Sequence, residues 1–511
     1  MVFAPVRILR FFIFPAFVLL SLFERCGGTK SEVEGEKLAK EVCGRCHLYP
    51  DPTALPRTYW EKQIFPSMAK FMGRFGSVDS RDSMFEIGEA GERVKQAGVF
   101  PNHPLIDDDD WNMILAYYLQ NAPEIIDFPK VQFTSNSNLF KLEKPLAARG
   151  SASTTLLKGL GQGQFIYGDA GTGRYIEFGA GFSIKKMGEL EQGPVHFIRK
   201  DKYDLITVMG SFAPTDAATG MLVKLPRDGK IPPSVFIDSL QRPVHTSVVD
   251  LDTDGIDDYI ISEFGKFTGA LSLFWSNKQG KLEKQVLAIT PGATKTEIAD
   301  MNNDGRMDIV ALFGQANERI DVWLNLGDRK FETVRLLSFP PYFGSSSFQL
   351  IDTDEDGDKD IVYTAGDNAD YTPVIKACHG IYIFENKGQM QFKQKLFLSM
   401  PGAYAAHWAD FDMDGYKDLL GVSFFPDWSS KNPADCLLWK GTKDGFLKPE
   451  QISLSHLGRW IVSDAGDMDG DGDTDVVLGS LMMEPKPDNG RLAEWLRLKI
   501  PLLVLRNQTK G

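Results

Sequence analysis

A nine-residue aspartate pattern, D-x-D-x-D-G-x-x-D, occurs five times in this chain and constrains its fold more than any other feature. The copies begin at residues 250, 300, 352, 410 and 467, so successive copies are 50, 52, 58 and 57 residues apart. One copy has asparagine at its third position, which is still an oxygen donor. A sequence period near 50 residues combined with strand signals indicates a β-propeller or a similar array.

The spacing within each copy suits a hard cation. Ca²⁺ takes six to eight oxygen ligands, and side chains at positions 1, 3, 5 and 9 with a backbone carbonyl at position 7 can surround one ion. Glycine at position 6 permits the sharp turn. An EF-hand would also need glutamate at position 12, where this chain has Ile, Ala, Tyr, Gly and Leu. An ion-free aspartate turn is the alternative for one loop, but five loops in register favour calcium. We expect up to five Ca²⁺ ions, with the ligands Asp250, Asp252, Asp254, Asp258, Asp300, Asn302, Asp304, Asp308, Asp352, Asp354, Asp356, Asp360, Asp410, Asp412, Asp414, Asp418, Asp467, Asp469, Asp471 and Asp475.

A short apolar strand, not a helix, follows each loop, and a second strand signature follows that strand. These units resemble FG-GAP/VCBS repeats, the calcium-loop blades of β-propellers, over about residues 145–511. Two degenerate units, around 164–178 and 197–208, precede the five loops. The expected fold is therefore mainly β, a seven-bladed propeller after a small all-α domain, with six or eight blades as alternatives. The strand at 502–507 is expected to close the ring.

A CxxCH motif, Cys43-Gly-Arg-Cys46-His47, lies in the N-terminal part. In this motif the two thiols attach a haem covalently and the histidine becomes the proximal iron ligand. A redox dithiol or half of a zinc site could also use two such cysteines. The chain has no second CxxC, and no thioredoxin-like strand precedes this one.

The residues around this motif resemble class I cytochromes c. Gly35 stands eight residues before Cys43, where that family packs its first helix on its last, and residues 107–121 are similar to that last helix. Candidates for the distal iron ligand are Met68, Met72, Met84 and His103. The stretch from Trp60 to Met68 resembles a pattern of propeller-fused cytochromes, so Met68 is the first choice and Met72 the second.

The N-terminus carries a targeting signal. Arg7 and Arg10 precede an apolar run over residues 11–23, which is too short to span a membrane comfortably and fits a secretory signal. Cys26 follows directly and resembles the lipidated cysteine of bacterial lipoproteins. An ordinary secretory signal or an uncleaved anchor is the alternative. We therefore expect a protein of the bacterial cell envelope, periplasmic or at the outer membrane, attached by lipid only.

These assignments divide the chain into a signal peptide (1–25), a lipidated tether (26–30), a cytochrome c domain (31–125), a linker (126–145) and the propeller (146–511).

Cys378 and Cys436 remain after the haem and lipid cysteines, and they either pair or stay as free thiols. Asp367, Lys376 and His379 lie in a long polar loop and are weak catalytic candidates; loop scaffolding is the favoured interpretation. We expect the two modules to meet on one face, with this loop near the haem edge.

The formal net charge is −13 at pH 7, but the five loops are more negative than the whole chain, so the remainder is net positive. The sequence has no basic stripe with interleaved aromatic residues, the pattern that would indicate nucleic-acid binding.

Three functions remain. The first is electron transfer, with a redox protein or a quinone-linked chain as partner and the propeller as a binding platform. The second is a propeller oxidoreductase, for example acting on sugars, that reduces its own haem. The third is a glycan-binding adhesion protein. Electron transfer is our expectation.

Overall fold

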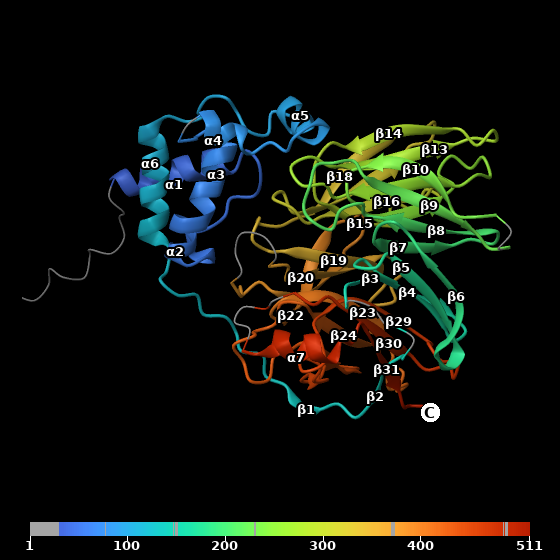
Figure 1. The fold of residues 1–511 in the computed structure, drawn as a ribbon. Coiled ribbons are helices and arrows are strands. Elements are labelled where there is room, and N and C mark those ends of the chain that lie inside the picture. Colours follow the sequence, from blue (N-terminus) through green and yellow to red (C-terminus); the bar gives the residue numbers. More distant parts are fainter. Residues whose placement is uncertain are drawn as a thin grey trace, which may run out of the picture.

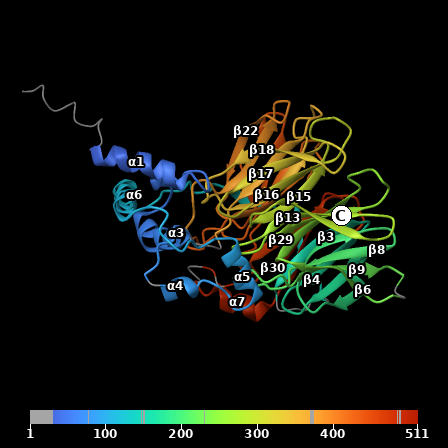
Figure 2. The same ribbon diagram turned by 90° about the horizontal axis from the view of Figure 1, so that it is seen from above.

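The computed structural model describes residues 30–510 except 77, 147, 149–151, 229–230, 369–373, 484 and 486–488. A helical module and a β-propeller lie side by side in it (Figures 1 and 2). The expected signal peptide and Cys26 lie outside the described residues. Among the residues that are described, no helix is both long and apolar enough to cross a membrane.

The helical module is built from short helices around one apolar core. Its elements are α1 (Lys30–Cys43), the 3₁₀ helix η1 (Pro52–Ala54), α2 (Arg57–Tyr59), the π-helix η2 (Trp60–Ile64), α3 (Phe65–Phe71), α4 (Val78–Asp82), α5 (Glu89–Gln96) and α6 (Asp108–Asn121). Helix α6 matches the helix expected at 107–121, and the Asp107 side chain caps it by accepting the Asp110 N–H at 2.8 Å.

Helices α1 and α6 cross closely at Gly35. A Cβ atom at Gly35 would lie 3.0 Å from the Cβ of Tyr117 and 3.2 Å from the carbonyl oxygen of Met113. The crossing therefore has little room for a side chain at this position. Trp60, Phe65 and Tyr118 pack in the core beneath it.

Seven sheets form the seven blades of the propeller, each with four antiparallel strands, and the sheet of blade 6 gains a fifth strand that pairs in parallel. The first four blades are β3 (Thr154–Gly161), β4 (Gln164–Asp169), β5 (Arg174–Gly179) and β6 (Ser183–Glu189); β7 (Pro194–Arg199), β8 (Tyr203–Val208), β9 (Gly220–Pro226) and β10 (Ser234–Leu240); β11 (Pro243–Val249), β12 (Asp258–Glu263), β13 (Ala270–Ser276) and β14 (Leu282–Ala288); β15 (Ala293–Ala299), β16 (Asp308–Phe313), β17 (Arg319–Asn325) and β18 (Phe331–Ser338). A 3₁₀ helix, η3 (Ala180–Phe182), joins β5 to β6.

The last three blades complete the ring. Blade 5 is β19 (Ser345–Ile351), β20 (Asp360–Ala365), β21 (Gly380–Asn386) and β22 (Phe392–Ser399); blade 6 is β23 (Ala403–Ala409), β24 (Asp418–Ser423), β25 (Cys436–Trp439) and β28 (Glu450–Gln451), with the hairpin β26 (Gly441–Thr442) and β27 (Gly445–Phe446); blade 7 starts with β29 (Trp460–Gly466), β30 (Asp475–Ser480) and β31 (Leu502–Asn507). Helix α7 (Arg491–Leu498) lies between β30 and β31.

The ring is closed by strands that precede the first blade. Strand β2 (Phe140–Glu143) pairs with β31 as the fourth strand of blade 7, and β1 (Thr134–Asn136) pairs with β28 on blade 6. The expected linker at 126–145 is thus wrong in its second half, because those residues supply sheet hydrogen bonds to the last two blades. The strand at 502–507 closes the ring only together with β2.

Candidate functional site

All five aspartate loops connect the first strand of a blade to its second, in blades 3 to 7. In each loop the sixth residue has φ between 85° and 97°, a left-handed conformation that glycine adopts without strain. The fourth residue is also left-handed, although only the last loop has glycine there; the others have Thr253, Asn303, Glu355 and Met413. This second strained position was not foreseen from the sequence.

The opening and closing aspartates organise each loop differently. In four loops the first aspartate accepts hydrogen bonds from the backbone N–H groups of the fifth and sixth residues. The closing aspartate is buried and accepts two further backbone N–H groups. Asp258, for example, accepts from Leu251 at 3.1 Å and from Ser276, at the end of the third strand, at 2.9 Å. The closing residue therefore joins the loop to two strands of its blade, whether or not an ion is bound.

The carboxylates converge closely enough to share a cation. Oxygen atoms from three aspartates lie within 4.8 Å of one another in four loops, namely Asp250, Asp252 and Asp254; Asp352, Asp354 and Asp356; Asp410, Asp412 and Asp418; and Asp467, Asp469 and Asp475. An all-oxygen donor set of this kind suits Ca²⁺. Burial raises the pKa of Asp258 to about 6 and that of Asp475 to about 7, so a nearby cation would favour their ionised forms.

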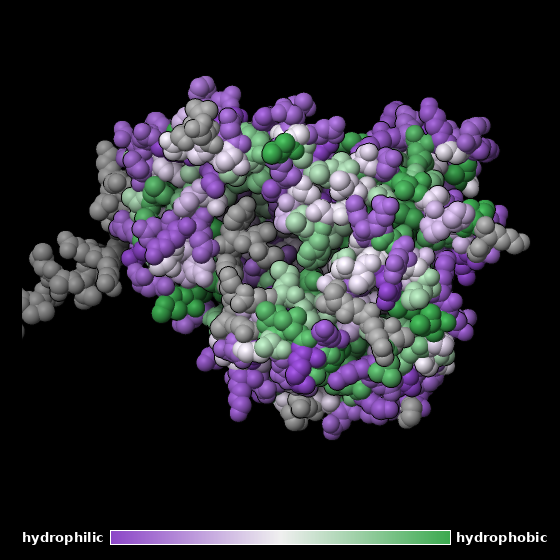
Figure 3. Space-filling model, in the orientation of Figure 1, coloured by the Kyte–Doolittle hydropathy of each residue, from purple (hydrophilic) through white to green (hydrophobic). Residues whose placement is uncertain are grey.

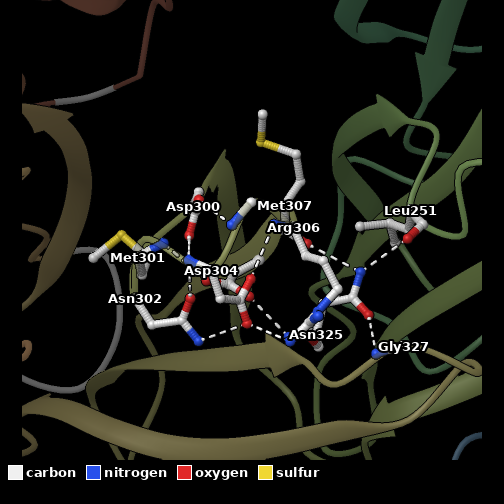
Figure 4. A network of polar contacts seen from close by, with 11 residues as sticks. Leu251, Asp300, Met301, Asn302, Asp304, Arg306, Met307, Asn325 and Gly327 are labelled. Carbon is white, nitrogen blue, oxygen red and sulfur yellow. Dashed lines mark hydrogen bonds and ion pairs between the residues drawn. The ribbon is translucent and has the colours of Figure 1, made fainter.

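The loop at 300–308 differs in its third residue (Figure 4). The Asn302 amide donates to Asp304 at 3.1 Å, and the Arg306 guanidinium forms an ion pair with Asp304. Basic side chains also pair with the third-position aspartates of the other four loops, through Arg329, Lys395, Lys440 and Arg506. These pairs neutralise part of the charge of every loop.

An asparagine at the end of the third strand links neighbouring blades at this end of the ring. The Asn325 amide donates to the carbonyl of Leu251, in the loop of the preceding blade, at 2.9 Å, and Asn507 donates to Phe411 at 2.7 Å in the same way. Asparagine recurs at the end of this strand in the sequence, and that recurrence was the signal for the contact. Which residue it contacts in the neighbouring blade depends on the ring geometry.

The CxxCH segment lies at the C-terminal end of α1. Cys43 is half-buried beside the aromatic core, and Cys46 is exposed. The Nδ1 atom of His47 lies 2.9 Å from the carbonyl oxygen of Leu48. A carbonyl oxygen only accepts, so Nδ1 carries the hydrogen in this contact and Nε2 is left with the lone pair that a metal needs. Two thiols and an imidazole in this arrangement fit a covalently attached haem.

The candidate distal ligands occupy different positions in the helical module. Met72, which follows α3 as its C-cap, packs against the apolar core, whereas Met68 is half-buried in α3 and is not part of that core. Met84 is half-buried and His103 is exposed. Core packing therefore accounts for Met72 and leaves the role of Met68 to be explained.

The weak catalytic candidates hold their own loop together. Lys376 is buried and donates hydrogen bonds to the Asn368 side chain and, at 3.2 Å, to the Val374 carbonyl. His379 is buried, its Nδ1 accepts the Gly402 N–H at 3.4 Å, and burial lowers its pKa well below the ordinary value. Burial lowers the pKa of Arg459 to about 10, and the charge of Asp367 partly offsets this effect. These contacts favour the scaffolding role for Lys376 and His379. Cys378 and Cys436 are free thiols.

The helical module contacts the end of the propeller opposite the aspartate loops. Because the strands of a blade are antiparallel, the connections between second and third strands all emerge at this end. Hydrogen bonds to the helical module come from the β8–β9 and β12–β13 connections. Burial raises the pKa of Tyr342 to about 12, and Cys378 and the charge of Asp51 add to this shift. The modules therefore meet on one face as expected, while the approach of residues 367–379 to a haem edge stays a prediction.

Comparison with known proteins identifies FG-GAP-like repeats at residues 250–311 and 300–363, which contain the first three aspartate loops. No curated protein matches the chain. Among solved structures, streptogramin B lyase has a TM-score of 0.45 at 12% identity over 72% of this chain and 98% of that one. The N-terminal domain of Nup159 has a TM-score of 0.41 at 10% identity over 69% and 96%. Likenesses this loose carry no argument about function.

Proposed function

We propose that this chain is an exported monohaem c-type cytochrome whose helical module is mounted on a calcium-binding FG-GAP propeller and acts in electron transfer. The observation that carries the proposal is the CxxCH motif at the end of α1, with the His47 imidazole oriented by the Leu48 carbonyl. When bound, the haem supplies a one-electron iron couple. Cys43 and Cys46 hold it covalently, and the Nε2 atom of His47 ligates the iron. A thioether from Met68, with Met72 as second choice, completes the ligand set.

The other parts of the proposal concern the propeller and the location of the protein. The five aspartate loops hold Ca²⁺ and stabilise the propeller, which serves as a platform for a redox partner protein, a quinone-linked chain or a carbohydrate. Cys26 carries the lipid that attaches the protein to the cell envelope, in the periplasm or at the outer membrane.

The decisive experiment is expression in a host that attaches c-type haem. The purified protein should show haem staining after denaturing electrophoresis and a mass increase equal to one haem. Replacing both Cys43 and Cys46 with serine should abolish both signals, while serine at Cys378 should not change them. Parent protein without covalent haem would refute the proposal.

A second candidate function is substrate oxidation at the propeller face with the haem as acceptor. The observation in its favour is that the helical module docks on the end of the propeller where the connection between β20 and β21 also emerges. A redox-difference spectrum recorded with and without sugars tests it. Haem reduction driven by a sugar would establish an oxidoreductase, and an unchanged spectrum would leave electron transfer as the function.

A further inference from the structure

One acidic residue of the helical module bonds to two different blades of the propeller. Glu86 lies between α4 and α5, and its carboxylate accepts hydrogen bonds from the Thr215 hydroxyl and, at 3.2 Å, from the Asp216 N–H. The same carboxylate lies 3.1 Å from Nζ of Lys266. Thr215 and Asp216 belong to the β8–β9 connection of blade 2, and Lys266 belongs to the β12–β13 connection of blade 3.

An aromatic contact lies next to this carboxylate. The ring of Phe267, from the propeller, lies 5.0 Å from that of Phe100 and 6.1 Å from that of Phe71, measured between centroids. Phe100 is buried in the helical module, and its ring also contacts Phe85 at 5.8 Å. The propeller thus inserts one apolar side chain into an aromatic cluster of the helical module, where edge-on rings stabilise each other.

The propeller side of this contact is braced by Asp216. Its buried carboxylate accepts hydrogen bonds from the backbone N–H groups of Phe267 at 2.9 Å and Thr268 at 2.7 Å, so the connections from blades 2 and 3 form one surface. Arg93 of α5 donates a further hydrogen bond to the Asp216 carbonyl. The donors that face the Glu86 carboxylate therefore belong to segments that other hydrogen bonds already hold in position.

We propose that Glu86 and Phe267 form a latch that holds the helical module and the propeller as one rigid body in solution. Small polar interfaces between domains usually leave them mobile, and the chain joins these modules only through the segment between α6 and β1. The latch fixes the orientation of the module that carries the CxxCH motif relative to the propeller, so it acts as a positioning device. It bears on the proposed electron transfer only if the haem is present, whereas its own test does not need haem.

The test is small-angle scattering of the full chain, combined with limited proteolysis of the segment at 122–133. The parent should scatter as one compact body and resist cleavage. Glu86→Lys should increase the radius of gyration and accelerate cleavage, because it places like charges together. Glu86→Lys with Lys266→Glu should restore much of the compact profile, since the ion pair returns with reversed sign. Phe267→Ala should also loosen the contact.

A matched control is available on α1, where Lys40 and Glu36 form an exposed ion pair at 2.6 Å. Reversing that pair should leave the scattering profile unchanged. Circular dichroism and thermal melts confirm that both modules stay folded in the variants used. A folded Glu86→Lys, Phe267→Ala double variant with the parent profile would overturn the proposal. So would a charge reversal at 86 and 266 that behaves no better than Glu86→Lys alone. Absence of covalent haem would refute the proposed function and leave this result unaffected.

Discussion

Met68 and Met72 differ by one turn of helix, and their contacts suggest different roles. Met72 belongs to the packing around the core, whereas Met68 does not. If Met68 is the distal ligand, Met68→Ala should remove the weak far-red absorption that a thioether gives with oxidised haem iron, and should lower the reduction potential. Met72→Ala should mainly lower the melting temperature. Retention of the far-red band in Met68→Ala would rule out this residue as the ligand.

Glu318 makes stability depend on pH, because burial raises its pKa to about 7 while the Ser345 hydroxyl and the N–H groups of Gly344 and Ser345 donate to it. A carboxyl with a higher pKa in the folded state binds more protons when folded, so its contribution to stability falls as pH rises from its ordinary value of 4.5 to about 7. The full effect is roughly 3 kcal/mol.

Glu318→Gln should therefore reduce the loss of unfolding free energy between pH 5 and pH 8, measured by denaturant titration at saturating calcium. Glu283, which is exposed, offers a control, since glutamine there should leave the pH dependence as it is. An equal slope in Glu318→Gln and the parent would contradict the assignment.

Within a loop, the fifth and ninth aspartates have separable roles. Asp414 lies on the exposed side of its loop, and asparagine there keeps an acceptor for the Tyr416 N–H but removes a charge. Asp418 instead accepts the N–H groups of Phe411 and Gly441 at 2.8 Å each. We expect Asp414→Asn to lower the melting temperature only when calcium is present, because an ion that binds the folded state stabilises it.

Asp418→Ala should destabilise the protein with or without calcium, by about 1–3 kcal/mol for each buried donor left unpaired. Parallel melts in calcium and in excess EDTA distinguish these cases.

For the parent, chelation should lower the melting temperature, and an unchanged melt in EDTA would count against calcium binding at all five loops. The ion pairs to Arg329, Lys395, Lys440 and Arg506 limit the size of this shift, because they already offset part of the repulsion.

The whole propeller depends on closure by β2, which precedes the first blade in the chain. Phe140 of β2 is buried, and its ring lies 5.8 Å from that of Phe411 in the loop of blade 6. Phe140→Ala should lower the unfolding free energy by about 3–5 kcal/mol, the usual cost of removing a buried phenylalanine. Leu142 lies on the same strand with a partly exposed side chain, and alanine there should cost much less. Equal losses in the two variants would show that ring closure does not depend on this packing.

Figure 3 shows hydrophilic residues over much of the helical module, with hydrophobic patches on both modules. Surface character of this kind does not indicate how two domains dock, and here the contacts between them come from the Glu86 carboxylate, the Phe267 ring and the Arg93 guanidinium. The charged run at 107–110 caps α6 through Asp107.

Local chemistry explains why so much was predictable from the sequence. The aspartate loops, the glycine at their sixth position and the strands on either side depend on residues close in the chain, so their pattern predicts both the blades and the clustered carboxylates. The same holds for α6, whose capping residue Asp107 directly precedes it. The closing strand β2, the Asn325 contact between blades and the Glu86 latch join residues far apart in the chain. Their partners are set by closure of the ring and by docking of one folded body on another, and no local pattern carries that information.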